Sequence, residues 1–194
     1  MDKNKWIDLS GFVVVGIIII VLFIYNRLES VKYQPKELIT VTAGYSLKIA
    51  VVGNESEFPY FSSISYHKRE LDNLVTNEEE NFDALIITKE AFSEADKDQF
   101  VEDFNKVKYP VFFYEAKGIS DDAFLEKGVT LDSSKINSSA YIRGYLNKEK
   151  ERVKWVLHLP DNKNISDKEI SDKEFSDKVN IFIQIYEIIV ESKR

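Results

Sequence analysis

Hydrophobic residues in this chain form one long uncharged run near the N-terminus and several short runs farther on. The long run covers residues 9–25 and contains no formally charged side chain. As a helix this run covers roughly 26 Å at 1.5 Å per residue, close to the hydrocarbon thickness of about 30 Å. We therefore predict a single-pass transmembrane helix in contact with the lipid bilayer, whose residues include Leu9, Phe12, Ile17, Leu22 and Tyr25.

The long run has two alternative interpretations, a retained anchor and a cleaved secretory signal. A signal has a shorter core of about 7–15 residues, followed by a small-residue cleavage site of the A-x-A kind. No such site follows this run, because Tyr25 is succeeded by Asn26, Arg27 and Leu28. A retained signal anchor is therefore favoured.

Two lysines in the tail before the span favour one orientation of the anchor. Lys3 and Lys5 lie in the tail 1–8, whereas the basic residues after the span lead into a large acidic domain that can translocate regardless of its charge. The numbers of basic residues on the two sides are nearly equal, so both directions stay open. We favour a cytoplasmic N-terminus and an extracytoplasmic C-terminal domain.

Four short hydrophobic runs follow a membrane-proximal connector, residues 26–46. They cover residues 47–52, 84–88, 111–114 and 153–159. Nearly continuous hydrophobic runs are typical of strands that are covered on both faces, as in a parallel sheet. We predict one three-layer α/β domain over 47–194, with a mainly parallel sheet of about four to five strands and a flavodoxin-like or Rossmann-like arrangement.

The segments between these runs predict helices. Residues 93–108 show helical spacing after a possible N-cap at Ser93, residues 60–80 show a weaker helical pattern, and residues 120–127 suggest a short helix that ends at Gly128. A run from Val179 with one narrow polar stripe predicts a buried C-terminal helix, for which a second membrane element is the alternative. The SDKE repeat, residues 165–178, is interpreted as a solvated loop or a frayed helix.

Composition excludes several kinds of function. The chain contains 26 basic and 33 acidic residues, for a net charge of −7, so it lacks the basic surface that a nucleic-acid-binding protein needs. It contains no cysteine, which excludes disulfides, thiolate metal ligands and a cysteine nucleophile. We expect no cofactor and no metal. The bias towards Lys, Asn, Ile and Glu fits a bacterial protein.

The candidate functional residues lie where the predicted strands end, since open α/β sheets bind ligands at the carboxyl ends of their strands. The candidate catalytic residues there are Glu55, Glu57, Glu115 and His158, and the candidate ligand-binding residues are Asn54, Lys89 and Lys117. Carboxylates with a histidine can perform acid and base chemistry. The alternative is that loop tips in a chain with 30% charged residues carry such side chains without a functional role.

Residues 82–115 form a strand, a helix and a proline-led strand in the order Phe82 to Glu115. This stretch resembles a unit of class I glutamine-amidotransferase-like domains. The resemblance implies a nucleophilic cysteine after the last of these strands, and this chain has none. The resemblance therefore implies a non-catalytic version of that domain.

These patterns indicate a membrane-anchored, extracytoplasmic α/β domain that acts as a non-catalytic interaction or accessory module with a protein partner in a bacterial envelope complex. One alternative is a membrane-anchored hydrolase that uses the carboxylates at the strand ends. Another alternative is an anchored ligand sensor that faces the cytoplasm.

Overall fold

The computed structural model describes residues 45–56, 58–74, 81–149, 151–160 and 167–194, the first six of the last range by their backbone only. The chain divides into two compact units, Met1–Lys36 and Glu37–Arg194, and all described residues belong to the second. The predicted span 9–25, most of the connector and Glu57 lie outside the described residues. Within the described ranges no helix is long and hydrophobic enough to cross a membrane.

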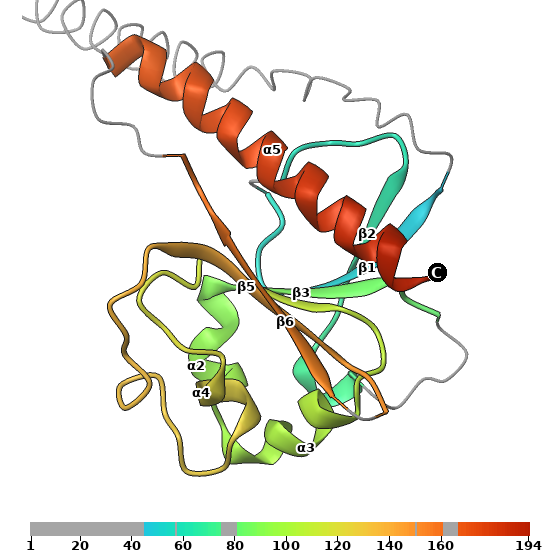
Figure 1. The fold of residues 1–194 in the computed structure, drawn as a ribbon, viewed down its shortest axis with the longest axis vertical. Helices are drawn as coiled ribbons and strands as arrows, with labels where there is room; N and C mark the ends of the chain where they lie inside the picture. The colour runs from blue at the N-terminus through green and yellow to red at the C-terminus, as the bar shows by residue number, and fades with distance from the viewer. Residues whose placement is uncertain (1–44, 57, 75–80, 150, 161–166) are drawn as a thin grey trace, which may run out of the picture. The chain divides into compact units, whose positions relative to one another are not determined.

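A six-stranded mixed sheet forms the centre of the domain (Figure 1). The first four strands in sheet order are parallel, β5 is antiparallel to β4, and β6 is antiparallel to β5. The predicted α/β domain is therefore confirmed, but the sheet has six strands rather than four to five. The order is β2-β1-β3-β4-β5-β6, with β1 Leu47–Val52, β2 Ile64–Lys68, β3 Ala84–Thr88, β4 Val111–Tyr114, β5 Ala140–Asn147 and β6 Arg152–His158.

The central strands are hydrophobic throughout because both faces of the sheet are covered. Every residue of β3 and β4 is buried. Successive side chains of a strand point to opposite faces, so Ile49 and Val51 pack in one core cluster and Ala50 and Val52 in the other. This arrangement explains why these strands show no alternating pattern in the sequence.

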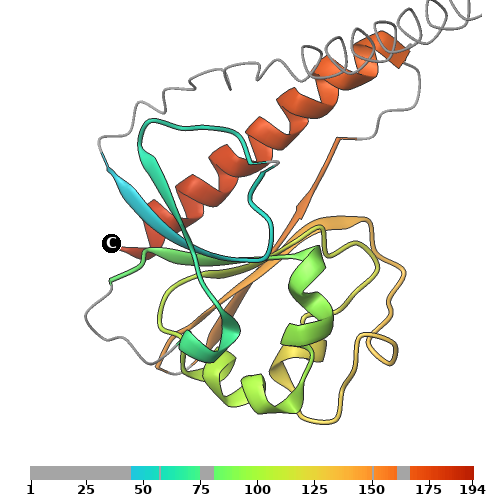
Figure 2. The same cartoon turned by 180° about the vertical axis from the view of Figure 1, so that it is seen from behind.

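Short helices cover one face of the sheet (Figure 2). Phe113 of β4 stacks on Phe124 with ring centroids 4.1 Å apart, which joins α4 to the sheet. The layer consists of η2 Lys89–Ala91, α2 Phe92–Ala95, α3 Asp98–Lys106 and α4 Asp122–Leu125.

The long helix α5, Asp167–Ser192, covers the opposite face (Figure 1). Its buried side chains include Ile181, Phe182 and Ile185, which pack in one cluster with β1, β3 and β4. Tyr186 donates a hydrogen bond to the Tyr45 carbonyl oxygen at 2.9 Å. The predicted C-terminal helix is thereby confirmed as a layer of this domain.

The structure corrects two helix predictions. Residues 93–108 do not form one helix, because Lys97 has an extended backbone with ψ of 134° and separates α2 from α3, and Ser93 lies inside α2. The range 60–80 contains β2 and a single 3-10 turn, η1 Leu71–Asn73, in its described part. β2 joins the parallel sheet beside β1, where tertiary pairing overrides a weak local helical pattern.

The region after β4 also differs from the sequence prediction. β5 was not predicted. In the segment 131–139 before it, Ser134 is buried and its hydroxyl donates to the Leu131 carbonyl oxygen. α5 begins at Asp167, so the helical interpretation of the SDKE repeat holds from that residue onward, and the loop interpretation does not. Lysine and glutamate favour helices, and Glu174 pairs with Lys178 at 3.5 Å one turn later.

Candidate functional site

A cavity of about 450 Å³ lies at the carboxyl ends of β1, β2 and β3. The chain passes from β1 to β2 on one side and returns to β3 on the other side of β1. Ligands of open α/β sheets bind where the strand order reverses in this way. The cavity volume is within the range of small-molecule sites, about 300–1,000 Å³.

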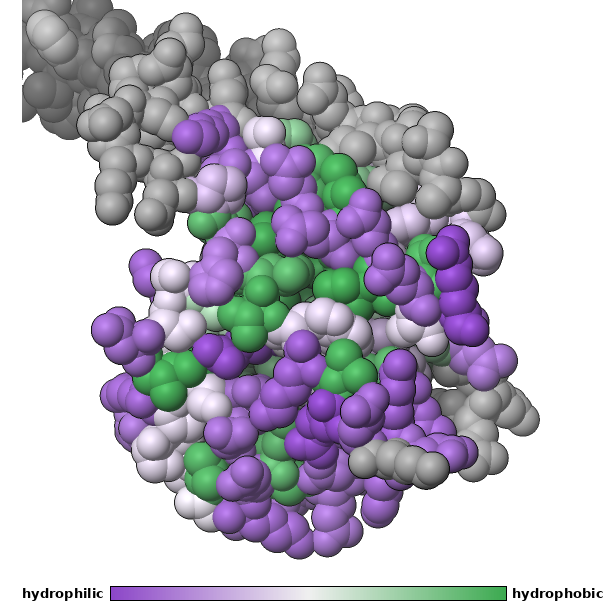
Figure 3. Space-filling model, viewed as in Figure 1, coloured by the Kyte–Doolittle hydropathy of each residue, from purple (hydrophilic) through white to green (hydrophobic). Residues whose placement is uncertain are grey.

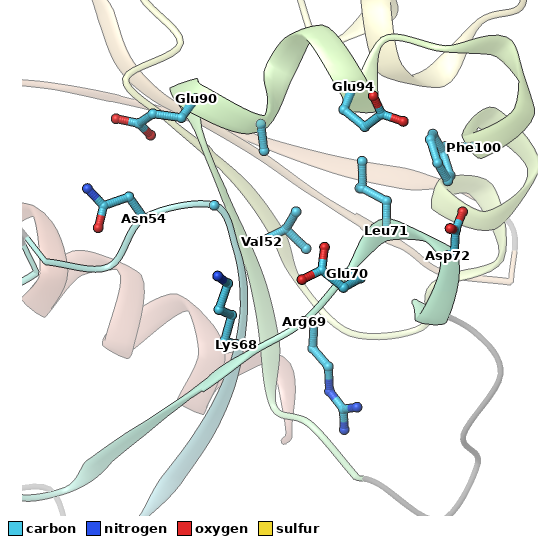
Figure 4. Close-up of a pocket in the computed structure, with 12 residues that line it drawn as sticks. Val52, Asn54, Lys68, Arg69, Glu70, Leu71, Asp72, Glu90, Glu94 and Phe100 are labelled. Atoms are coloured by element: carbon cyan, nitrogen blue, oxygen red, sulfur yellow. The ribbon is translucent and has the colours of Figure 1, made fainter.

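The cavity has a hydrophobic interior and a charged rim (Figure 4). Val52, Leu71 and Phe100 contribute hydrophobic side chains to its lining. Arg69 points away from it in Figure 4, and its guanidinium lies 4.8 Å from the centre of the Phe82 ring. The charged side chains of the rim are Lys68, Glu70, Asp72, Glu90 and Glu94, which give it an excess of negative charge.

The turn after β1 packs directly against the end of β3. Gly53 has φ of +105°, and a Cβ added there would lie 2.0 Å from Thr88 Oγ1. The Asn54 N–H donates to the same oxygen at 3.0 Å. Interaction with the Thr88 hydroxyl, followed by the Glu90 backbone N–H, holds the pKa of Glu90 below its usual value. One hydroxyl thus connects the ends of both strands.

A smaller hollow of about 10 Å³, roughly the room for one water, opens between β3 and β4. Glu115 borders it and has φ of +63°, a left-handed backbone conformation that non-glycine residues seldom adopt. The Tyr141 hydroxyl donates to Glu115 Oε1 at 3.0 Å and lies 3.0 Å from the Tyr114 hydroxyl. Burial, followed by these contacts, raises the pKa of Tyr141, so Tyr141 stays protonated as the donor.

The structure brings some of the sequence-predicted site residues together and separates others. Asn54 and Glu115 both border the small hollow. His158 lies on β6, two strands from β4, roughly 10 Å away across the sheet, and its Nδ1 is 3.1 Å from Ser139 Oγ. Glu55, Lys89 and Lys117 are exposed, and Glu57 lies outside the described residues. The predicted catalytic residues Glu115 and His158 therefore do not meet.

Sequence reasoning did not identify Thr88 and Tyr141 as site residues. Thr88 is the last residue of a predicted strand, and a hydroxyl-bearing residue at that position could have indicated a site residue in the sequence. Tyr141 lies on the unpredicted strand β5, and only the antiparallel pairing of β4 with β5 places it beside Glu115. No group of three or more histidines, cysteines, aspartates or glutamates within the described ranges is arranged to hold a metal ion.

A second surface of interest is the outer edge of β6. In the described part of the chain β6 pairs only with β5, and it is the last strand in the sheet order. Its residues alternate between exposed and half-buried, and Val156 is 45% exposed. Figure 3 has the view of Figure 1, with α5 above the sheet and the short helices below it, and shows hydrophobic side chains between α5 and the rest of the domain. Trp155 and Leu157 are partly buried hydrophobic residues on that side of β6.

No protein-family model, no curated protein and no solved structure matches this chain.

Proposed function

We propose that this protein is a single-pass membrane-anchored α/β domain that acts as a non-catalytic interaction or accessory module and holds a partner protein at the extracytoplasmic membrane surface. The uncharged run 9–25 supports the anchor. The observation that carries the interaction role is the outer edge of β6, beside which no further strand lies among the residues that the structure describes. Unpaired N–H and C=O groups along an edge strand form hydrogen bonds with a further strand from another chain.

The position of the carboxylates supports a binding role over the hydrolase alternative. Glu115, directly after β4, accepts a hydrogen bond from Tyr141. His158, at the end of β6, instead contacts Ser139, the residue before β5. A general acid and base pair must be within hydrogen-bond reach of one reacting group. Two side chains separated by two strand spacings do not meet this requirement.

Co-purification of the full chain from membranes in a mild nonionic detergent tests this proposal. A matched control carries an unrelated hydrophobic span in place of residues 9–25 and retains the whole domain. The proposal predicts that the same protein is recovered in stoichiometric amount with both forms, because the domain holds it. Recovery of this chain alone, or of a partner that is lost with the exchanged span, would contradict it.

The cavity favours a second candidate function, that of an anchored ligand sensor. Its volume of about 450 Å³ and its place at the strand ends suit a small polar molecule. Screening the full chain for ligand-dependent shifts of amide resonances at Gly53, Leu71 and Ala91 tests this candidate. A ligand that shifts all three and loses affinity in the Glu90→Gln variant favours the sensor, whereas shifts confined to distant residues exclude this site.

A further inference from the structure

The backbone of β6 has a defined outward-facing set of groups. In the hairpin that joins β5 and β6, the Lys148 N–H donates to the Glu151 carbonyl at 2.9 Å, and Asn147 is opposite Arg152. Hydrogen-bonded and non-hydrogen-bonded pairs alternate along an antiparallel ladder. Val153, Trp155 and Leu157 therefore bond to β5. Arg152, Lys154 and Val156 direct their N–H and C=O groups away from the sheet.

The side chains of β6 differ on its two faces. The face that carries α5 has the half-buried side chains of Val153, Trp155 and Leu157, and the exposed residues between them lie on the other face. Trp155 stacks on Phe112 with ring centroids 6.0 Å apart. A strand placed beside β6 would extend the sheet at this edge and set every second side chain against this hydrophobic row. The row therefore suits a segment with a hydrophobic residue at every second position.

The opposite face of β6 carries two cationic side chains, Arg152 and Lys154, in a protein of net charge −7. The Arg152 guanidinium donates to the side-chain oxygens of Asn147 and Asn105, which are neutral partners. Lys154 lies 2.8 Å from Asp121 and 3.6 Å from Asp122, yet its side chain remains 47% exposed. These contacts hold both cations in place along the edge. Lys154 is already paired with two aspartates, whereas Arg152 has only neutral hydrogen-bond partners among the described residues and attracts a carboxylate from a neighbouring strand.

We propose that the β6 edge, residues 152–158, binds an extended segment of a partner protein in which hydrophobic and acidic residues alternate, and that this segment adds to the sheet as a seventh strand. The backbone of the segment bonds to the outward groups of Arg152, Lys154 and Val156. Its hydrophobic side chains lie against Trp155 and its neighbours, and its carboxylates face the cations. This inference rests on the proposed interaction function and specifies the partner.

The test uses the full chain in nonionic detergent micelles and two capped nine-residue peptides. One peptide alternates glutamate with valine, and the other alternates lysine with valine. Binding of the glutamate peptide is expected to be saturable and to slow hydrogen exchange at the Arg152, Lys154 and Val156 amides at least tenfold. The Val153, Trp155 and Leu157 amides, already bonded to β5, are expected to change little. The lysine peptide is expected to bind at least tenfold more weakly.

Two pairs of variants distinguish backbone pairing from charge. Val156→Pro removes an outward N–H but no bond to β5, and is expected to weaken binding about tenfold, whereas Val156→Thr retains the N–H and the affinity. Arg152→Gln is expected to weaken binding of the glutamate peptide severalfold, whereas Lys97→Gln, an exposed lysine between α2 and α3, leaves it unchanged. If Val156→Pro disturbs folding, the comparison of Arg152→Gln with Lys97→Gln still tests whether the peptide binds at the β6 edge.

Several results would overturn the proposal. These are the absence of saturable binding, equal affinity for the two peptides, and slow exchange of the three outward amides before any peptide is added. The last result means that a second copy or another segment of this chain already covers the edge. If Val156→Pro and Val156→Thr recover the same membrane partner equally, the edge proposal fails and the interaction function stands. If the peptide binds as expected but no partner co-purifies, the interaction function fails instead.

Discussion

Replacing Gly53 with alanine tests whether the turn after β1 is built around the Thr88 hydroxyl. A Cβ at position 53 would lie 2.0 Å from Thr88 Oγ1, far inside any real contact distance. Thr88 is buried, so its side chain can yield only by rotating away from Asn54. The substitution therefore adds a left-handed backbone penalty and removes the hydrogen bond from the Asn54 N–H.

These two contributions set the expected loss of stability. A non-glycine residue with positive φ costs roughly 1–2 kcal/mol. Loss of a hydrogen bond of this kind costs about 0.5–1.5 kcal/mol. With some residual crowding against Thr88 Cβ, which lies 3.2 Å from the added Cβ, Gly53→Ala is expected to lower the free energy of unfolding by about 2–4 kcal/mol.

Gly128 provides a matched control within the same chain. It has φ of +79°, and a Cβ added there meets no atom within 4 Å, so Gly128→Ala introduces only the backbone penalty. Urea unfolding of the full chain in detergent micelles, followed by Trp155 fluorescence in a Trp6→Phe background, measures both variants. Gly53→Ala is expected to cost about 1–2 kcal/mol more than Gly128→Ala.

A double-mutant cycle identifies the atom responsible. In a Thr88→Ala background the overlapping oxygen is absent, and the difference between the two glycine substitutions is expected to shrink to about 0.5 kcal/mol or less. Equal losses for Gly53→Ala and Gly128→Ala in the wild-type background would refute the reasoning. A difference that persists without the Thr88 hydroxyl would refute it as well.

Two further predictions concern individual hydrogen bonds. Tyr145→Phe removes a buried donor 2.8 Å from the Phe104 carbonyl, which still accepts from Asn147, so urea unfolding is expected to show a loss of about 1 kcal/mol and not the larger cost of an orphaned carbonyl. The lowered pKa of Glu90 means that its ionised form stabilises the fold: the stability advantage of wild type over Glu90→Gln is expected to be present above pH 4.5 and to vanish as the pH falls through the lowered pKa. Unfolding curves from pH 6 to pH 3 measure this difference, and an advantage that grows on acidification would contradict it.

The parallel part of the sheet could be predicted from the sequence because its signal is local. β1, β3 and β4 are hydrophobic at nearly every position, and burial on both faces requires that composition. β2 carries no such signal, since Tyr66, His67 and Lys68 are half-buried or exposed at the edge of the sheet. Its identity as a strand depends on pairing with β1, a contact between segments distant in sequence.

In the candidate sites, too, the features that depend on pairing between separate strands could not be predicted from the sequence. The clustering of Asn54 and Glu115 follows from the shared carboxyl edge of parallel strands, which the sequence pattern indicates. The contact of Tyr141 with Glu115 requires β5, and the open edge of β6 requires the reversal of direction after β4. The run 153–159 is a strand as predicted, with bounds one residue earlier, but nothing in its residues specifies an antiparallel neighbour.

Labelling of introduced cysteines in intact cells tests the membrane-anchored extracytoplasmic module most directly. The chain has no cysteine, so Asn137→Cys at an exposed loop and Asn4→Cys in the tail before the span each provide a single reporter. A membrane-impermeant maleimide is predicted to modify position 137 in intact cells and position 4 only after lysis, with both variants recovered in the membrane fraction. Labelling of position 4 alone in intact cells, or recovery of the chain free of membranes, would contradict the proposal.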